Sequence, residues 1–295
     1  MNRVSAEVAF RMSCELGEGS LWNDQAGVLL WVDISEHKVF VFDPRNGSNL
    51  AYDVGESVGT VVLSRNDKLL LALRSGLASL DPATGALHPI VDPEADIEGN
   101  RFNDGKCDPQ GRFWAGTMVE RGPRGGAALY RLDTDLSITK QIDDVTTSNG
   151  LVWSRDSRRF FYIDTPTHQV RCYEFDPEAG DLRAPRVVAE VAREVGAPDG
   201  MAIDEHDHLW IALFRGGRVI RVDPSTGSIE FEVELPVDNV TSCAFGGPDL
   251  DVLYITTARA GLDAERRAKQ PLAGSLFRAK VPYRGVPAVR FGGDL

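Results

Sequence analysis

The strongest constraint on the fold is a short pattern that the chain repeats six times, at intervals of 40 to 50 residues. Each copy has a polar residue, a glycine, a few apolar residues, a turn, and then a β-rich run with an aromatic residue. The glycines that mark the first five copies are Gly19, Gly59, Gly105, Gly150 and Gly200, and Cys243 stands at the corresponding place in the sixth. Internal repeats of this length are typical of propellers and solenoids, so they bear directly on the fold class.

A second alternating strand follows in each copy and mostly ends in a turn that begins with Asp-Pro or Asp-Thr. Examples are KVFVFDPRNG from Lys38, VRCYEFDPEAG from Val170 and RVIRVDPSTG from Arg218. Proline presets φ in such a turn and glycine accepts a positive φ. The strands are short and rich in Val, Ile, Leu, Tyr and Trp, with no 3.6-residue period. Six such units, each with about four short strands, predict an all-β six-bladed β-propeller that forms a single domain over residues 1–295.

Closure of the ring follows from the same repeat. One unit cannot cover both faces of its own sheet, so the six units must pack against one another around an axis. We expect four antiparallel strands per blade, and we expect the extended segment Ala6–Met12 to supply the outer strand of the last blade. A β-sandwich is the competing all-β fold, but it gives no reason for the repeat.

The charge balance excludes some classes of partner. Lys and Arg number 32 and Asp and Glu number 44, so the net charge is 32 − 44 = −12. Such an acidic chain lacks the basic surface that a nucleic acid or an anionic membrane requires, and we expect neither as a partner. The N-terminus has no apolar run long enough for a signal peptide, and the four cysteines form no CxxC pair. We therefore expect a cytoplasmic protein without disulfides.

The repeat also predicts where polar side chains gather. In a propeller the inner strands line a central channel, so equivalent positions of different copies meet at one mouth. The residues before the marker positions are Glu18, Val58, Asp104, Asn149, Asp199 and Ser242. Carboxylates that converge on a narrow opening either have raised pKa values or surround a cation. Asn-Gly and Asp-Gly are also ordinary turn dipeptides, but their shared place in the repeat favours a common site for a hard cation such as Ca²⁺, Mg²⁺ or Mn²⁺.

At these residues the sequence resembles the regucalcin and gluconolactonase family of six-bladed propeller lactonases. The resemblance covers nearly the whole chain and depends on long motifs in the right order. These motifs are LGEGSLW from Leu16, RFNDGKCDPQGRFWAGTM from Arg101, SNGLVWS from Ser148, PDGMAID from Pro198, CAFGGPDLDVLYITTAR from Cys243 and QPLAGSLF from Gln270.

The resemblance implies a particular set of site residues. The family holds one divalent metal with the Glu of GEG, the Asn of SNG and the Asp of PDG, which correspond to Glu18, Asn149 and Asp199. It does not use the residue that corresponds to Asp104 as a ligand. The metal, which could be Ca, Zn, Mn, Mg or Fe, would polarise a lactone carbonyl and acidify a water, with Asp199 as the catalytic general base.

Substrate contacts are implied in the same way. The sugar-contacting Arg and Asn of the family's RFND motif correspond to Arg101 and Asn103, and a Glu shortly after GTM corresponds to Glu120. Arg121 stands where close relatives often carry the acid. We predict that the glycine-rich segment 119–128 forms a loop at the channel mouth, in the position of a lid.

The favoured reading is thus a monomeric, metal-dependent lactonase that opens a sugar lactone of the gluconolactone or aldonolactone type. A second reading keeps the site and changes the substrate to other esters or organophosphates. A third is a propeller without catalytic activity that binds calcium as a regulator or serves as a scaffold. No GxSxG elbow is present, so an acyl-enzyme mechanism has no support, and His206 and His208 are expected to be solvated turn residues.

Overall fold

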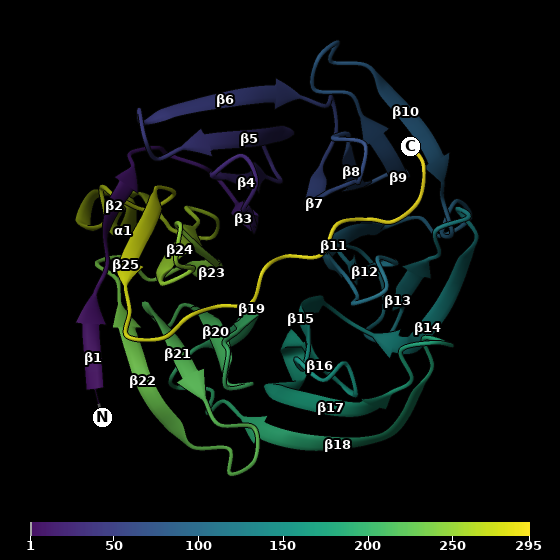
Figure 1. Cartoon of the computed structure of the whole chain (residues 1–295). Coiled ribbons are helices and arrows are strands. Elements are labelled where there is room, and N and C mark those ends of the chain that lie inside the picture. The colour runs from purple at the N-terminus through teal and green to yellow at the C-terminus, as the bar shows by residue number, and fades with distance from the viewer. Residues whose placement is uncertain (1) are drawn as a thin grey trace.

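Each copy of the repeat folds into one antiparallel sheet of four strands, and the six sheets stand around a common axis (Figure 1). The computed structural model describes residues 2–295. The predicted six-bladed β-propeller is confirmed, with the first strand of each copy nearest the axis.

The strands follow one another from the axis to the rim within each blade. Blade one has β3 (Gly17–Asn23), β4 (Val28–Asp33), β5 (Lys38–Asp43) and β6 (Ser48–Asp53). Blade two has β7 (Val58–Leu63), β8 (Leu69–Leu73), β9 (Gly76–Leu80) and β10 (Leu87–Val91). Blade three has β11 (Asn100–Cys107), β12 (Phe113–Val119), β13 (Ala127–Leu132) and β14 (Ile138–Val145).

The other three blades repeat this order. Blade four has β15 (Ser148–Trp153), β16 (Arg159–Asp164), β17 (Gln169–Phe175) and β18 (Leu182–Glu190). Blade five has β19 (Ala197–Ile203), β20 (Leu209–Phe214), β21 (Arg218–Val222) and β22 (Ile229–Glu234). Blade six has β23 (Val240–Gly246), β24 (Val252–Thr257) and β25 (Leu276–Lys280), and takes its outer strand from the N-terminus. A 3₁₀ turn (η1, Thr165–Thr167) and one short helix (α1, Ala264–Lys269) interrupt the strands.

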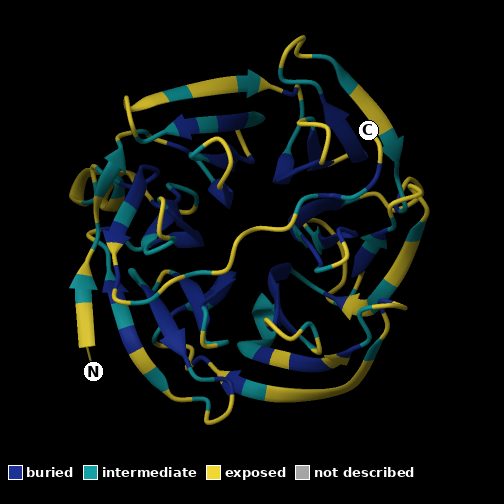
Figure 2. Cartoon of the chain, in the orientation of Figure 1, coloured by how far each residue is buried: buried dark blue, intermediate teal, exposed yellow. Residues whose placement is uncertain are grey.

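Burial decreases from the axis to the rim (Figure 2). The inner strand β3 is buried at every residue, whereas the rim strand β6 is mostly exposed. Trp31, Trp114 and Trp210 lie on the second strands of their blades and are fully buried. These three tryptophans are thus packing residues of the blades, whose large rings fill the wedge-shaped space toward the rim.

The N-terminal segment closes the ring. β2 (Glu7–Phe10) pairs antiparallel with β25, with Val8 opposite Phe277, which confirms the predicted clasp. β1 (Asn2–Ser5) adds a contact that the sequence did not predict, because it pairs in parallel with β22 as a fifth strand of blade five. The first residues of the chain therefore join the fifth and sixth blades.

Every inner strand has a break in its register beside the marker position. The breaks fall between Glu18 and Leu21, Val58 and Thr60, Phe102 and Gly105, Ser148 and Leu151, Pro198 and Met201, and Val240 and Ser242. A β-bulge bends its strand and redirects the side chains around it. The repeated bulge thus changes the direction of the strand at the residues that the sequence marked as site candidates.

Glycine at the marker positions permits neighbouring inner strands to approach closely. A Cβ added to Gly59 would lie 2.3 Å from the carbonyl oxygen of Asn103. A Cβ added to Gly150 would lie 2.7 Å from the carbonyl oxygen of Asp199. Any larger residue would push the inner strands apart, so the glycines set the width of the channel.

The C-terminal tail, residues 281–295, crosses the ring as the yellow segment of Figure 1. Gly285 forms an antiparallel bridge with Asp204, and Phe291 forms a parallel bridge with Ser64. The Phe291 ring is fully buried and anchors the far end of the tail. The repeat gave no sign of this crossing. Within residues 2–295, no helix has the length and apolar character needed to cross a membrane.

Removal of the clasp tests how the ring is closed. We expect deletion of residues 2–10 to lower the melting temperature by 10 °C or more, because β25 loses its ladder partner and blade six becomes a three-stranded sheet with an open edge. Deletion of residues 2–5 alone removes only the exposed fifth strand of blade five and should lower it by about a third as much. Equal losses in thermal unfolding scans of the two proteins would contradict this account.

Candidate functional site

The predicted metal ligands lie at the starts of three inner strands, at one mouth of the channel. Glu18 is on β3, Asn149 on β15 and Asp199 on β19, and their exposed fractions are 6%, 4% and 7%. Asp104 lies at the same level on β11 and is equally buried. The ring therefore brings these four oxygen-bearing side chains from blades one, three, four and five to one end of the axis.

The three carboxylates share one electrostatic environment. Burial and the nearby charge of Asp104 raise the pKa of Glu18 to about 8. Burial and the charges of Glu18 and Asp104 raise the pKa of Asp199 well above its usual range, and burial likewise raises the pKa of Asp104. Each of these shifts means that the ionised form is destabilised, so a bound cation would stabilise all three carboxylates at once.

Few donors compensate these buried acids. The amide of Gly19 donates to Glu18 Oε2 at 3.0 Å, and the amide of Gly105 donates to Asp104 Oδ1 at 2.8 Å. Asp104 Oδ2 is buried without a hydrogen-bond partner in the described chain. A buried carboxylate oxygen without a partner is costly, and a cation at this mouth would compensate it.

Asn149 is held with its oxygen in a defined direction by neighbours on both sides. Its Nδ2 donates to Thr165 Oγ1 at 2.8 Å, and Thr165 in turn donates to the carbonyl of Pro198 at 2.7 Å. Its Oδ1 accepts from Asn103 Nδ2 at 2.9 Å. An amide oxygen has two lone pairs, so Oδ1 retains one for a cation. The residues at this mouth therefore fit a hard divalent ion with oxygen ligands.

The predicted substrate residues join this network. Arg101 Nη1 donates to Asn103 Oδ1 at 2.8 Å, and Arg101 Nε donates to Glu120 Oε1 at 2.9 Å. Glu120 also forms an ion pair with Arg74 of blade two, so its carboxylate lies between two guanidinium groups. The hydrogen bonds thus run without interruption from Arg74 through Glu120, Arg101 and Asn103 to Asn149.

Arg101 and Asn103 differ in the hydrogen-bond donors that they leave free for a substrate. Both amide hydrogens of Asn103 are engaged, since Nδ2 donates to the carbonyl of Ser148 at 2.8 Å as well as to Asn149. Asn103 can therefore meet a substrate only as an acceptor. Arg101 Nη2 has no hydrogen-bond partner within residues 2–295, although the side chain is only 6% exposed. That nitrogen is the donor most available to a ligand at this mouth.

The predicted loop lies beside this network. Glu120 and Arg121 both donate their backbone amides to the carbonyl of Gly99, at 2.9 and 3.0 Å. Residues 120–124 are exposed, as expected for a segment at the mouth. Its role as a lid stays a prediction.

A second acidic cluster lies elsewhere on blade five. Ligand atoms of His208, Asp223 and Glu230 all lie within 4.8 Å of one another, and this is the one such trio of acids, histidines or cysteines in residues 2–295. The carboxylates of Glu18, Asp104 and Asp199 do not all lie within that distance of one another, and the third member of the predicted metal set is the amide of Asn149. Glu230 is already paired with the guanidinium of Arg221 and lies 3.2 Å from His208 Nε2. The blade-five cluster is thus a mixed ion-pair network, and His208 is half-buried rather than a solvated turn residue as expected.

Sequence reasoning missed three residues around the predicted site. Thr165 lies in η1, far from any repeat marker, and Arg74 lies in a turn after β8. Neither position carries a signal that a single sequence could reveal. Lys106 is the second residue after the RFND motif, and its positive charge opposes the upward shift in the pKa values of Glu18 and Asp104. Its place on the inner strand β11 could have identified it.

A six-bladed propeller with buried acids, an amide and an arginine at one mouth is the class of protein that these observations define. Over residues 16–259 the chain matches the family described as SMP-30/Gluconolactonase/LRE-like region, and it belongs to this family.

The relatives cover nearly the full length of the chain. It is 41% identical over 280 residues to a protein of Bacillus subtilis (strain 168) named "Putative sugar lactone lactonase YvrE", with 95% of this chain and 96% of the relative covered. It is 38% identical over 299 residues to regucalcin of Gallus gallus, with 99% and 100% covered.

Solved structures show the same ring. A calcium-binding protein, regucalcin, from Agrobacterium tumefaciens superposes with a TM-score of 0.93 at 26% identity, with 98% of each chain covered. A luciferin-regenerating enzyme superposes with a TM-score of 0.91 at 30% identity, with 97% of this chain and 99% of that chain covered. A gluconolactonase from Xanthomonas campestris, at 21% identity and a TM-score of 0.74, shares the fold, with 93% and 89% covered.

The raised carboxyl pKa values predict how stability depends on pH in protein stripped of divalent cations. The unfolded state releases the Glu18 proton near pH 4.5 and the folded state only near pH 8, so the free energy of unfolding should fall as pH rises between these values. In Glu18→Gln this fall should be smaller, because the substituted side chain does not ionise and no longer repels Asp199. Denaturant titrations of both proteins with EDTA at several pH values measure it, and equal slopes would contradict the coupling.

Proposed function

We propose that the chain is a divalent-cation-dependent hydrolase that opens a sugar lactone of the gluconolactone or aldonolactone type. The observation that carries this proposal is the meeting of buried Glu18, Asn149 and Asp199 with the Arg101–Asn103 pair at one mouth. Two findings support lactone hydrolysis as the reaction class. The chain belongs to the SMP-30/Gluconolactonase/LRE-like family, and its Bacillus subtilis relative is named as a putative sugar lactone lactonase.

Glu18, Asn149 and Asp199 would hold the cation. When bound, a divalent ion supplies Lewis acidity, which polarises a lactone carbonyl and lowers the pKa of a water. Two carboxylates and one amide carry a charge of −2, which matches a divalent ion, and they leave room in its shell for water and substrate. Oxygen ligands of this kind can hold Ca, Zn, Mn, Mg or Fe.

Asp199 would be the general base. Ester hydrolysis needs a group that removes a proton as water attacks the carbonyl carbon, and the buried carboxylate of Asp199 would lie beside the cation that acidifies that water. The proton would then pass to the ring oxygen as the lactone C–O bond breaks, which yields the hydroxy acid.

Arg101, Asn103 and Glu120 would orient the sugar. Arg101 Nη2 has no partner in the described chain and can donate to a ring or hydroxyl oxygen, whereas Asn103 can accept from a sugar hydroxyl. Glu120 is held between Arg101 and Arg74, so its first effect is to position the Arg101 guanidinium. Fixing the substrate against Asp199 in this way lowers the entropic barrier.

Two other functions would use the same mouth. A hydrolase of aryl esters or organophosphates would show higher kcat/KM on those substrates than on aldonolactones in a direct comparison. A calcium-binding regulator is suggested by the description of the Agrobacterium tumefaciens structure as a calcium-binding protein. A regulator would bind the ion without turnover, so lactone assays on EDTA-stripped protein reloaded with each of the five ions separate it from an enzyme. Monomeric state and cytoplasmic location stay predictions.

Substitution of the proposed base tests the mechanism. We expect Asp199→Asn to lower kcat for an aldonolactone by about 10²- to 10⁴-fold at saturating cation, because the amide keeps one oxygen ligand but cannot accept the proton. The exposed Asp24→Asn is the matched control and should retain full activity. Initial rates over a series of cation concentrations separate weaker cation binding from lost catalysis. Wild-type kcat in Asp199→Asn would refute the assignment.

Replacement of Arg101 tests substrate orientation. We expect Arg101→Lys to raise KM for the lactone about tenfold or more, because lysine keeps the charge but cannot reproduce the donor at Nη2 while it binds Glu120. Isothermal titration should give a cation dissociation constant close to that of the wild type, since Arg101 contacts no proposed ligand directly. A large loss of cation affinity with unchanged KM would assign Arg101 to the metal site instead.

A further inference from the structure

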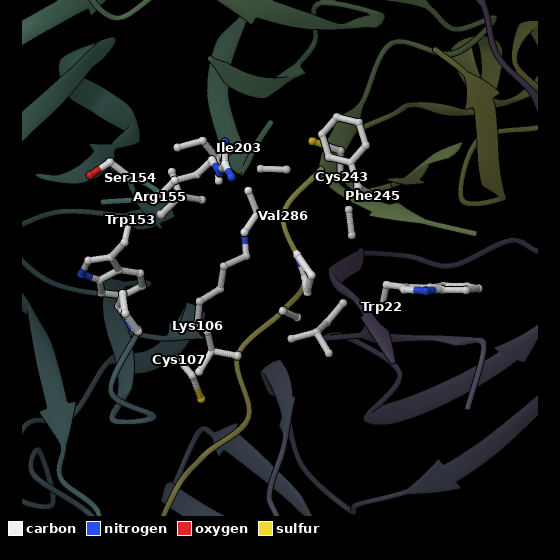
Figure 3. Close-up of a pocket in the computed structure, with 18 of the residues that line it drawn as sticks. Trp22, Lys106, Cys107, Trp153, Ser154, Arg155, Ile203, Cys243, Phe245 and Val286 are labelled. Atoms are coloured by element: carbon white, nitrogen blue, oxygen red, sulfur yellow. The ribbon is translucent and has the colours of Figure 1, made fainter. Parts of the chain in front are cut away.

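A cavity of about 220 Å³ lies at the mouth opposite Glu18 and Asp199, under the C-terminal tail. Its walls come from the later residues of five inner strands and the turns after them, including Trp22, Lys106 and Trp153, and its roof is residues 286–289 (Figure 3). None of the proposed metal ligands or substrate residues lines it. We call it the tail-side cavity.

The walls of the tail-side cavity are mainly apolar. Trp22, Val152, Trp153, Ile203 and Phe245 all line it. A cavity of about 150 Å³ with such a lining is large enough to bind benzene, so a compact aromatic or aliphatic group fits in this one. An apolar cavity that is not filled by side chains is a cost to the fold, which a ligand would offset.

The charged side chains that line the tail-side cavity are both cations. They are Lys106 and Arg155, and no Asp or Glu is among the lining residues. This is unusual in a chain with a net charge of −12. Figure 3 shows Lys106 extending toward Val286 of the tail, with Arg155 approaching from the neighbouring blade. The cavity is thus complementary to a negative charge.

The two cations retain donors for a ligand. Lys106 Nζ donates to the carbonyl of Met201, and this is its one acceptor within residues 2–295. An ammonium has three donors, so two are open. Arg155 Nη1 donates to the carbonyl of Glu205 at 2.9 Å, and the rest of its guanidinium has no partner in the described chain.

The roof is held only at its two ends. The amide of Gly285 donates to the carbonyl of Leu250 at 2.7 Å, and the amide of Phe291 donates to the carbonyl of Leu63 at 2.7 Å. Between them Val286, Pro287, Ala288 and Val289 are exposed and form no hydrogen bond with any other part of residues 2–295. Lifting these four residues would break no ladder, which provides a route into the cavity.

We propose that the tail-side cavity binds a small amphipathic organic anion, an aromatic or aliphatic carboxylate whose acid group meets Lys106 and Arg155 and whose apolar body packs against the apolar lining residues. Trp22 and Trp153 line the cavity, so binding changes their fluorescence. This site is separate from the proposed lactone site and does not depend on it.

Naphthalene-2-carboxylate is the probe, and the neutral naphthalene-2-carboxamide is its isostere. With the full-length protein loaded with cation, we expect saturable tryptophan quenching and one bound carboxylate per chain by calorimetry. The carboxamide should bind at least tenfold more weakly, because it lacks the charge-assisted hydrogen bonds to the two cations. Equal affinity for acid and amide, or no saturable binding, would overturn the proposal.

Variants locate the anion. Lys106→Met should weaken carboxylate binding about tenfold or more and leave carboxamide binding unchanged, whereas Lys106→Arg should stay within a few-fold of wild type. Arg155 is exposed, so Arg155→Met should not disturb folding, and it should likewise weaken carboxylate binding. Arg101→Met is the control at the other mouth. Loss of carboxylate binding in Arg101→Met but not in Lys106→Met or Arg155→Met would place the anion in the lactone site and refute the inference. Thermal unfolding scans show whether each variant is folded.

Discussion

Close packing of six inner strands around one axis is the constraint on which the rest of this structure depends. Neighbouring strands approach so closely that a Cβ at Gly59 or Gly150 would collide with a backbone carbonyl of the next blade. A register break beside each of these positions bends the strand there. The residue before each glycine is thereby buried near the axis. For this reason an Asn-Gly or Asp-Gly dipeptide, which elsewhere would form a turn, here places its polar side chain in the candidate site.

The same packing produces the electrostatics of the channel. Burial and mutual repulsion raise the pKa values of Glu18 and Asp199. The same residues in a solvent-exposed loop would not have raised pKa values. Lys106, further along β11, opposes this effect and carries positive charge toward the other end. The axis therefore has an acidic mouth suited to a cation and an apolar, cationic end suited to an organic anion. Membership of the SMP-30/gluconolactonase family bears on the first of these ends.

Much of the fold could be predicted because the sequence pattern repeats once for each blade. The repeat identified six blades, and the unpaired segment before the first copy identified the clasp that β2 forms with β25. The parallel pairing of β1 with β22 and the crossing of the tail could not be foreseen, since both join segments more than eighty residues apart without any repeat to indicate the partner. The site was predicted only in part. Asp104 and Glu18 could be identified by their shared position in the repeat, whereas Thr165 lies outside the repeated pattern.

By itself the sequence determined the all-β repeat, the acidic charge and the chemical nature of the side chains that face the axis. Only the tertiary structure decided which of them meet. It showed that both amide hydrogens of Asn103 are engaged, that Glu120 is held between two arginines, and that the tail covers one mouth. The physical reason is that periodicity encodes direction and burial along a strand, whereas contacts between blades depend on distances across the ring, to which the local pattern is insensitive.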